Sequence, residues 1–148
     1  MDENKRINEQ IESYYHSWFE MNDIYNSWAK RHKIQQNTLF ALYVIHNAEP
    51  NCTQSHICNQ LFLPKQTVSQ ILSVLEQSGH IVKTPNPNDR RNKLITLTEE
   101  GKSISIAILD KLRLAEIEAF SKLSAQQRES ITESFKLLNE VLSKSFST

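Results

Sequence analysis

Basic and hydrogen-bonding side chains that could bind nucleic acid are concentrated in residues 64–98. The whole chain carries 17 basic and 17 acidic residues, so its total charge is balanced. Within residues 64–98 the acidic residues are only Glu76 and Asp89. The basic residues of this stretch are Lys65, Lys83, Arg90, Arg91 and Lys93. The stretch therefore has a local positive field, which attracts the phosphates of nucleic acid.

This stretch opens with residues of the kind that read the edges of DNA bases. They are Pro64, Lys65, Gln66, Thr67, Ser69 and Gln70. A glutamine amide suits adenine, whereas a lysine suits guanine or a phosphate. In a helix-turn-helix the N-terminal residues of the second helix enter the major groove. We therefore expect these residues to lie at the start of a recognition helix.

Helical spacing predicts the scaffold that would position these residues. Apolar residues recur every three or four positions from Val68 to Leu75, and Gly79 is a natural left-handed C-cap for that helix. Pro64 suits the first turn of the helix, where its missing amide hydrogen is not needed. The pattern favours a recognition helix between Pro64 and Gly79.

A shorter helix is expected just before this one. Thr53 is a good N-cap, and three apolar residues follow it at helical spacing, Ile57, Cys58 and Leu61. The order is therefore helix, tight turn, helix. Thr53 and Gln54, at the start of the shorter helix, are expected to contact a DNA phosphate.

A β-hairpin is predicted to follow the recognition helix. Residues 80–84 and 93–98 are two β-branched runs, and the segment between them is rich in Pro, Asn and Asp. The expected DNA contacts of this hairpin are Asp89, Arg90, Arg91 and Lys93.

Amphipathic helices are expected on both sides of this central unit. Ile7, Ile11, Tyr14, Trp18, Met21, Tyr25 and Trp28 form a heptad-like apolar stripe. Thr98 can cap a further helix, and a capping box from Ser124 to Gln127 opens the last one. The stripe suits an ordinary core, a two-stranded coiled coil or a seam between subunits, and we interpret it as the core of a dimer.

The fold class predicted is mainly α with a small β-hairpin wing, a winged helix-turn-helix flanked by terminal dimerisation helices. Its expected segments are an N-terminal dimerisation helix over residues 1–33, a DNA-binding lobe over 34–100, and C-terminal dimerisation helices over 101–148. Together they would make one intertwined domain.

Three motifs resemble the MarR family of winged helix-turn-helix transcription regulators. Residues 88–98, Asn-Asp-Arg-Arg-Asn-Lys-Leu-Ile-Thr-Leu-Thr, are similar to the family wing, Asp-x-Arg followed by five residues and Leu-Thr. Residues 53–61, Thr-Gln-Ser-His-Ile-Cys-Asn-Gln-Leu, resemble Thr-Gln-x-Glu-Leu-Ala-x-x-Leu. Upstream of the wing, Thr-Val-Ser at residues 67–69 precedes Leu-Glu-Gln-Ser-Gly at residues 75–79.

The resemblance implies a homodimer that binds a pseudo-palindromic DNA operator. The terminal helices of two subunits would interlock, and the wing arginines would reach minor grooves or phosphates. Arg91 matches the wing arginine of the family, and Asp89 matches the acidic residue that orients it. The chain departs from the family at His56, where glutamate is usual, and at Cys58, where alanine is usual.

The sequence gives less support for an effector pocket and for a redox-active cysteine. The aromatic residues of the first helix could line a pocket for a small aromatic or amphipathic effector, or they could simply pack. The pocket candidates are Tyr14, His16, Trp18, Tyr25 and Trp28. Cys52 could be a redox thiol, which would require a lowered pKa and solvent access, and Cys58 is expected to pack inertly.

No cofactor, metal site or enzymatic activity is expected. The chain has only two glycines, too few for a phosphate loop or a dinucleotide fingerprint. None of the five histidines has a partner three or four residues away, the spacing that places two metal ligands on one helix face. Without an apolar leader or a membrane-length apolar run, we expect a cytoplasmic protein that does not contact membranes.

The function predicted is sequence-specific binding of double-stranded DNA, with repression of transcription that a small-molecule effector relieves. The other possible effect of DNA binding is activation of transcription. The alternatives are a winged-helix module that binds protein in place of DNA, and a thiol-based redox protein.

Overall fold

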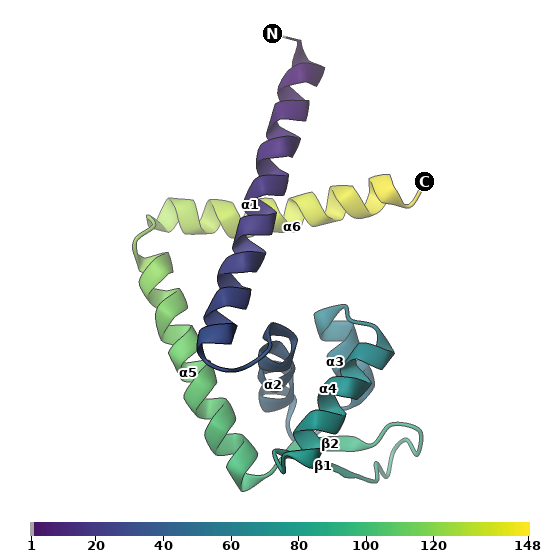
Figure 1. Ribbon diagram of the computed structural model, residues 1–148. Coiled ribbons are helices and arrows are strands. Elements are labelled where there is room, and N and C mark those ends of the chain that lie inside the picture. The colour runs from purple at the N-terminus through teal and green to yellow at the C-terminus, as the bar shows by residue number, and fades with distance from the viewer. Residues whose placement is uncertain (1) are drawn as a thin grey trace. The chain divides into compact units, whose positions relative to one another are not determined.

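The computed structural model describes residues 2–148, which form six helices and one two-stranded sheet (Figure 1). The helices are α1 (Glu3–Arg31), α2 (Gln36–Ala48), α3 (Gln54–Leu61), α4 (Lys65–Gln77), α5 (Glu99–Ser121) and α6 (Ala125–Phe146). The strands are β1 (Ile81–Thr84) and β2 (Leu94–Leu97). This composition confirms the predicted fold class.

The chain divides into two compact parts, residues 2–109 and residues 110–148. The boundary lies inside α5. The first part contains α1, the helix-turn-helix, the hairpin and the start of α5. The second contains the rest of α5 and all of α6.

The shorter helix of the helix-turn-helix begins where its cap predicted. The Thr53 hydroxyl accepts a hydrogen bond from the His56 backbone N–H at 3.1 Å. This bond satisfies one of the amides that an α-helix leaves free at its N-terminus. The helix ends at Phe62, whose backbone is left-handed, with φ of 54°.

The recognition helix, α4, starts one residue later than expected. Pro64 is its N-cap in an extended conformation, with φ of −61° and ψ of 148°, and not a residue of its first turn. The Val68 N–H donates to the Pro64 carbonyl oxygen at 3.2 Å. The first helical residue is therefore Lys65.

Gly79 ends α4 as predicted. Its φ is +76°, and the His80 N–H donates to the Leu75 carbonyl oxygen at 2.9 Å while the Gly79 N–H donates to Glu76 at 3.0 Å. These two bonds form a Schellman motif, which satisfies carbonyl groups at the helix end.

The predicted hairpin forms an antiparallel pair in which Ile81 lies opposite Leu97 and Thr84 opposite Leu94. Ile81, Ile95 and Leu97 are buried, so one face of the hairpin packs on the core. The Ile95 N–H also donates to the Cys52 carbonyl oxygen at 2.8 Å. That bond ties the hairpin to the segment that leads into α3.

The central lobe has one hydrophobic core, to which α2, α3, α4 and both strands contribute. Figure 1 shows α2, α3 and α4 grouped on one side of the hairpin. The buried residues of this core are Ala41, Leu42, Val44, Ile45, Cys52, Ile57, Val68, Ile71, Leu72, Leu75, Ile81, Ile95 and Leu97. All of them lie within the predicted lobe, residues 34–100.

The terminal helices have capped starts and mostly exposed apolar side chains. The Gly101 N–H donates to the Thr98 hydroxyl at 3.0 Å, and Ser124 and Gln127 form the predicted capping box. On α1, Trp18 is 56% exposed and Met21 is 47% exposed. Within residues 2–148, no helix combines the length and the apolar character needed to cross a lipid bilayer.

Candidate nucleic-acid interface

The recognition helix exposes its polar face because its apolar side chains bury the opposite face. Val68, Ile71, Leu72 and Leu75 are all in the core. Of the predicted base-reading residues, Thr67 is half-buried. The exposed ones are Pro64, Lys65, Gln66, Ser69 and Gln70. These five are therefore accessible to a molecule that approaches α4.

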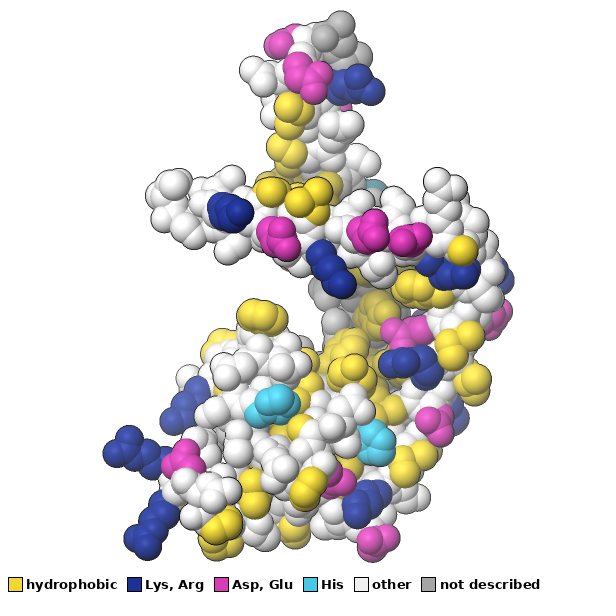
Figure 2. All heavy atoms as spheres, turned by 180° about the vertical axis from the view of Figure 1, so that it is seen from behind, with side chains coloured by type: hydrophobic (Ala, Val, Ile, Leu, Met, Phe, Trp, Pro, Cys, Tyr) yellow, Lys and Arg dark blue, Asp and Glu magenta, His cyan; other side chains and the backbone are white. Residues whose placement is uncertain are grey.

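The wing presents unpaired arginines. Arg90 and Arg91 are exposed, and within residues 2–148 neither guanidinium makes an ion pair or a hydrogen bond to the protein. Figure 2 shows Lys and Arg side chains projecting into solvent at one edge of the lobe. Guanidinium groups with free donors are suited to phosphates and to the edges of bases.

Asp89 shapes the loop through its backbone and does not contact the Arg91 guanidinium. Its Oδ1 accepts from the Arg91 backbone N–H at 3.0 Å, and its Oδ2 accepts from the Asn92 side-chain amide at 2.9 Å. These two hydrogen bonds hold the pKa of Asp89 below its usual value, and the bond from the Asn92 side chain has a larger effect than the bond from the Arg91 backbone. Asp89 is therefore ionised at neutral pH and keeps the loop folded around Arg91.

Asn92 also connects the wing to α3. The Ser55 hydroxyl donates to the Asn92 Oδ1 atom at 2.9 Å. Together with the Asn92–Asp89 bond, this forms a chain of hydrogen bonds that we call the wing latch, made of Ser55, Asn92 and Asp89. The latch joins the recognition unit to the arginine-bearing loop. We did not predict Ser55 or Asn92 as site residues.

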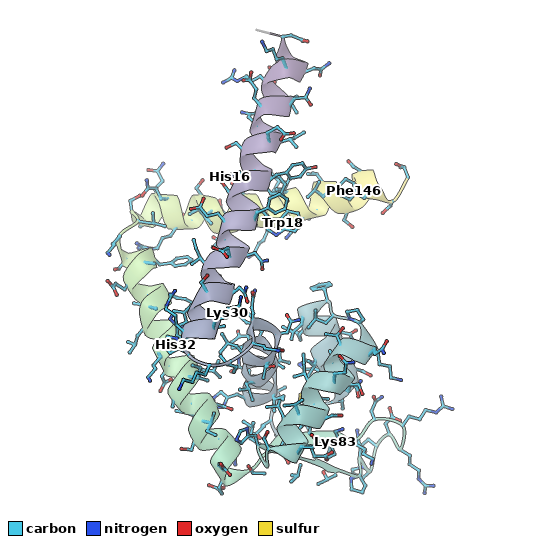
Figure 3. The ribbon with its side chains drawn as sticks, viewed as in Figure 1. His16, Trp18, Lys30, His32, Lys83 and Phe146 are labelled. Carbon is cyan, nitrogen blue, oxygen red and sulfur yellow. The ribbon has the colours of Figure 1, made fainter. Side chains whose placement is uncertain are left out.

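A cavity of about 460 Å³ lies between α3, the start of α4 and the wing. Its lining includes four cations from three elements, Lys65, Lys83, Arg91 and Lys93. Lys83, on β1, lies beside α4 in Figure 3, with its ammonium 3.9 Å from the Glu76 carboxylate. The other cations have no acidic partner within residues 2–148. The structure thus brings three predicted DNA contacts, Lys65, Arg91 and Lys93, around one positive hollow.

The two residues predicted to contact phosphate at the start of α3 are engaged with the protein. The Thr53 hydroxyl caps the helix, as described above. The Gln54 side-chain amide donates to the Lys65 carbonyl oxygen at 3.1 Å. This bond fixes the start of α3 against the start of α4, so Gln54 helps to position the recognition helix.

Cys52 lacks both properties that the redox hypothesis requires. Its side chain is fully buried in the core, and burial, aided by the Glu49 carboxylate, raises the pKa of its thiol to about 11. The protonated thiol is a poor nucleophile, so this prediction is corrected. Cys58 is half-buried, packed partly on the core and partly against the cavity.

The aromatic residues proposed for an effector pocket make separate contacts along α1. Tyr14 stacks on Trp18 with ring centroids 6.1 Å apart, and Tyr25 lies 5.8 Å from Phe40 of α2. Trp28 stacks on His32, which Figure 3 labels near the end of α1, and the His16 Nε2 atom lies 3.6 Å from the Glu20 carboxylate. These contacts are separate from one another within residues 2–148, and the effector site stays a prediction.

A helix-turn-helix followed by a cationic hairpin defines the winged helix-turn-helix class. The family model described as the MarR family matches residues 32–92. The regulator SarZ of Staphylococcus aureus is 29% identical over 124 residues, which cover 82% of this chain and 78% of SarZ.

Solved structures have the same fold. NMB1585, a MarR family regulator from Neisseria meningitidis, aligns with a TM-score of 0.76 at 24% identity, covering 99% of this chain and 98% of that one. The S. aureus MepR–DNA complex aligns with a TM-score of 0.72 at 23% identity, covering 88% and 94% of the two chains. The chain is therefore similar to the MarR family over its central lobe, as its motifs indicated, and it has the fold of these solved structures.

Proposed function

We propose that this protein is a homodimeric transcription regulator that binds double-stranded DNA at a pseudo-palindromic operator in the cytoplasm. One observation carries the proposal, namely that Lys65 at the exposed start of α4 and the unpaired Arg91 of the wing border the same positive hollow. A recognition helix in the major groove and a cationic wing on the flanking backbone need this arrangement. The DNA complex of MepR, a protein with the same fold, supports this reading.

We propose that the protein represses transcription by covering a promoter. Two linked lobes on neighbouring turns of DNA would cover about 20 base pairs, because half-sites one helical turn apart are separated by about 10 base pairs. A bound dimer of that footprint would exclude other proteins from the same segment.

A small aromatic or amphipathic effector is the proposed release signal. Exposed aromatic side chains on α1, with Phe19 65% exposed and Trp18 56% exposed, support a binding site near this helix in the dimer. An effector can lower DNA affinity only by binding better to a conformation whose recognition helices mismatch the grooves. The measurement is operator affinity with and without phenolic carboxylates; unchanged affinity for the whole panel would remove the effector from the proposal.

The test of the main proposal is selection of bound fragments from genomic DNA, followed by salt titration of the best fragment. We expect two-fold symmetric sites and an affinity that falls steeply with salt. The control protein carries both Arg90→Ala and Arg91→Ala and should lose the salt-dependent binding. If no fragment is enriched at any salt concentration, the protein is a winged-helix module that binds protein, and DNA binding is wrong.

A further inference from the structure

Phe62, in the turn between the two helices of the helix-turn-helix, has an almost fully exposed side chain. It is 92% exposed, and no other large apolar residue within residues 2–148 is as exposed. Single exposed apolar side chains are common on protein surfaces, so exposure alone does not assign a role to this residue. It does show that burial of the ring contributes almost nothing to the stability of the fold.

The backbone of Phe62 provides a second observation. It is left-handed, with φ of 54° and ψ of 39°. This conformation brings the Cβ atom too close to the following carbonyl oxygen, so it is disfavoured for every residue with a side chain and rare for a bulky one. Gly79 adopts the same region at the end of α4, with φ of +76°, and has no Cβ atom to strain. Phe62 therefore carries a strain that glycine would avoid.

The fold holds Phe62 in this conformation without using its ring. Leu61 and Leu63, on either side, pack partly on the core. The Cys58 carbonyl oxygen accepts hydrogen bonds from the Phe62 N–H and from the Leu63 N–H, the latter at 3.3 Å. The turn is thus fixed by its backbone and by the flanking leucines. Because packing does not offset the strain at Phe62, a contact outside the chain is the remaining source of compensation.

The turn places Phe62 at the end of α4 that approaches DNA in a helix-turn-helix. Phe62 comes three positions before Lys65, so the two Cα atoms are at most about 11 Å apart. Lys65 lines the positive hollow together with Arg91 of the wing. The Gln54 side chain bonds to the Lys65 carbonyl oxygen at 3.1 Å and so holds the start of α4 in place. Phe62 therefore lies at the margin of the candidate nucleic-acid interface.

The chemistry of the ring matches the sugars of the DNA backbone. Phe62 has no charge and no hydrogen-bond donor, so its side chain does not pair with a phosphate. The sugar–phosphate backbone borders the groove, and contacts to phosphate and sugar fix the register and orientation of a protein on the duplex. The deoxyribose carbons are the apolar part of that backbone, and contact with them removes the exposed ring from water.

We propose that Phe62 packs against a deoxyribose at the margin of the operator half-site and thereby positions the start of α4 in the groove. This inference rests on the DNA-binding function proposed above. A sugar contact carries no sequence information and releases no counterions. Phe62 should therefore differ from the base-reading residues of α4, which set sequence preference, and from Arg91, which sets salt dependence.

The experiment measures DNA affinity across a salt series for the full-length parent and for Phe62→Gly. The two probes are the duplex that genomic selection enriches most and the same duplex with its sequence scrambled. Phe62→Gly should bind both about 10-fold more weakly for each half-site occupied, because part of a phenyl ring is no longer buried. The slope of log affinity against log salt should equal that of the parent. Tyr43→Ala, which removes an exposed aromatic ring on α2, is the matched control and should bind like the parent.

A second variant and a melting experiment separate loss of the contact from loss of structure. Phe62→Gly relieves the left-handed strain, so its melting temperature should be no lower than that of the parent. Phe62→Asn keeps a residue type that tolerates this backbone but lacks the ring, and it should bind DNA as weakly as Phe62→Gly. Weak binding by Phe62→Gly alone would assign the effect to a flexible turn and overturn the inference. A melting temperature several degrees lower for both variants would assign Phe62 to the fold, with the same consequence.

The remaining outcomes distinguish this inference from the proposed function. Parent-like affinity of both Phe62 variants would overturn the inference and assign the exposed ring to a protein partner, while DNA binding stands. A loss confined to one of the two duplexes would also overturn it, because a sugar contact is independent of sequence. Failure of the parent to bind either duplex at any salt concentration would overturn the proposed function itself.

Discussion

At the scale of the residue, we expect Arg91 to be dispensable to the fold and central to DNA binding. It is exposed on the wing tip, with its backbone held by Asp89 and its guanidinium free. Its side chain therefore contributes charge to the interface without supporting the core. The contribution of Arg91 to DNA binding can therefore be measured in variants that still fold.

Arg91→Ala should weaken binding to every DNA sequence by a similar factor. The slope of log affinity against log salt should become shallower by about one for each phosphate contact removed in each subunit. Salt titrations on operator and scrambled DNA measure this slope. Arg113→Ala, which alters an arginine paired with Glu116 on α5, should leave both slopes unchanged. Parent-like binding by Arg91→Ala at every salt concentration would refute the wing assignment.

We expect Asn92 to contribute to DNA binding, because its side chain bonds to Ser55 and to Asp89, the two ends of the wing latch. Asn92→Ala removes the hydrogen bond that contributes most to the low pKa of Asp89, so this pKa should rise toward its ordinary value. Carboxyl NMR signals of Asp89 followed through an acid titration would report the change. Asn88→Ala is the neighbouring control, because within residues 2–148 Asn88 bonds through its backbone N–H, to the Asn86 side-chain oxygen, and not through its side chain.

The wing latch also predicts how DNA binding changes with pH. A carboxylate whose folded pKa is depressed stabilises the folded loop above its unfolded pKa, and this contribution is lost as pH falls through the folded pKa. DNA binding by the parent should therefore fall in acid below the ordinary aspartate range. The Asn92→Ala variant should bind more weakly at neutral pH with little change in melting temperature, because Asp89 and the loop are exposed. A large drop in melting temperature would assign Asn92 to folding and not to the wing.

At the scale of elements, the start of α5 is fitted closely against the end of α4. The Thr98 hydroxyl donates to the Gly79 carbonyl oxygen at 2.6 Å and accepts from the Gly101 N–H at 3.0 Å. The Thr98 N–H donates to the His80 carbonyl oxygen at 3.0 Å. One threonine thus joins the recognition helix, the hairpin and α5.

Gly101→Ala should destabilise this junction although alanine is the better helix former. A Cβ atom at this position would overlap the His80 carbonyl oxygen, which belongs to the backbone and cannot turn aside. Overpacking of this kind costs about 1–3 kcal/mol. Chemical denaturation should show a lower free energy of unfolding, whereas the exposed neighbour Ser103→Ala should show a small gain. Equal or greater stability of Gly101→Ala would contradict the close fit.

At the scale of the whole molecule, the terminal helices leave large apolar side chains exposed. Phe19, Leu114 and Phe135 are 65%, 68% and 47% exposed, on α1, α5 and α6 respectively. Burial of apolar surface contributes about 25 cal/mol for each Å² removed from water, so faces of this kind favour association. We predict that a homodimer buries them.

Light scattering should therefore report about twice the 17.2 kDa mass of one chain. Trp18→Glu places a charge in the apolar stripe and should favour the monomer, which should bind a palindromic site far more weakly than the parent. Tyr43→Glu, on an exposed position of α2, is the control and should stay dimeric. A monomeric parent that binds a palindrome tightly at micromolar concentration would defeat this prediction, because two half-sites require two linked lobes.

The amino-acid sequence alone determined the elements of this protein, because their signals are local. Thr53, Gly79 and Ser124 act on backbone groups within a few residues, and helical spacing of apolar residues is visible within each segment. The hairpin follows for the same reason, from two β-branched runs around a loop. These local rules, with three motifs, were enough to indicate a resemblance to the MarR family and to predict DNA-binding residues.

Only the tertiary structure decided how the site is held together, because those interactions join residues far apart in the chain. Ser55 and Asn92 are separated by 37 positions, and no periodic pattern links a serine on one helix with an asparagine on a distant loop. The burial of Cys52, which raises the pKa of its thiol, likewise depends on the packing of other elements around it. A residue's type states what chemistry is possible, whereas its neighbours in space decide which chemistry it performs.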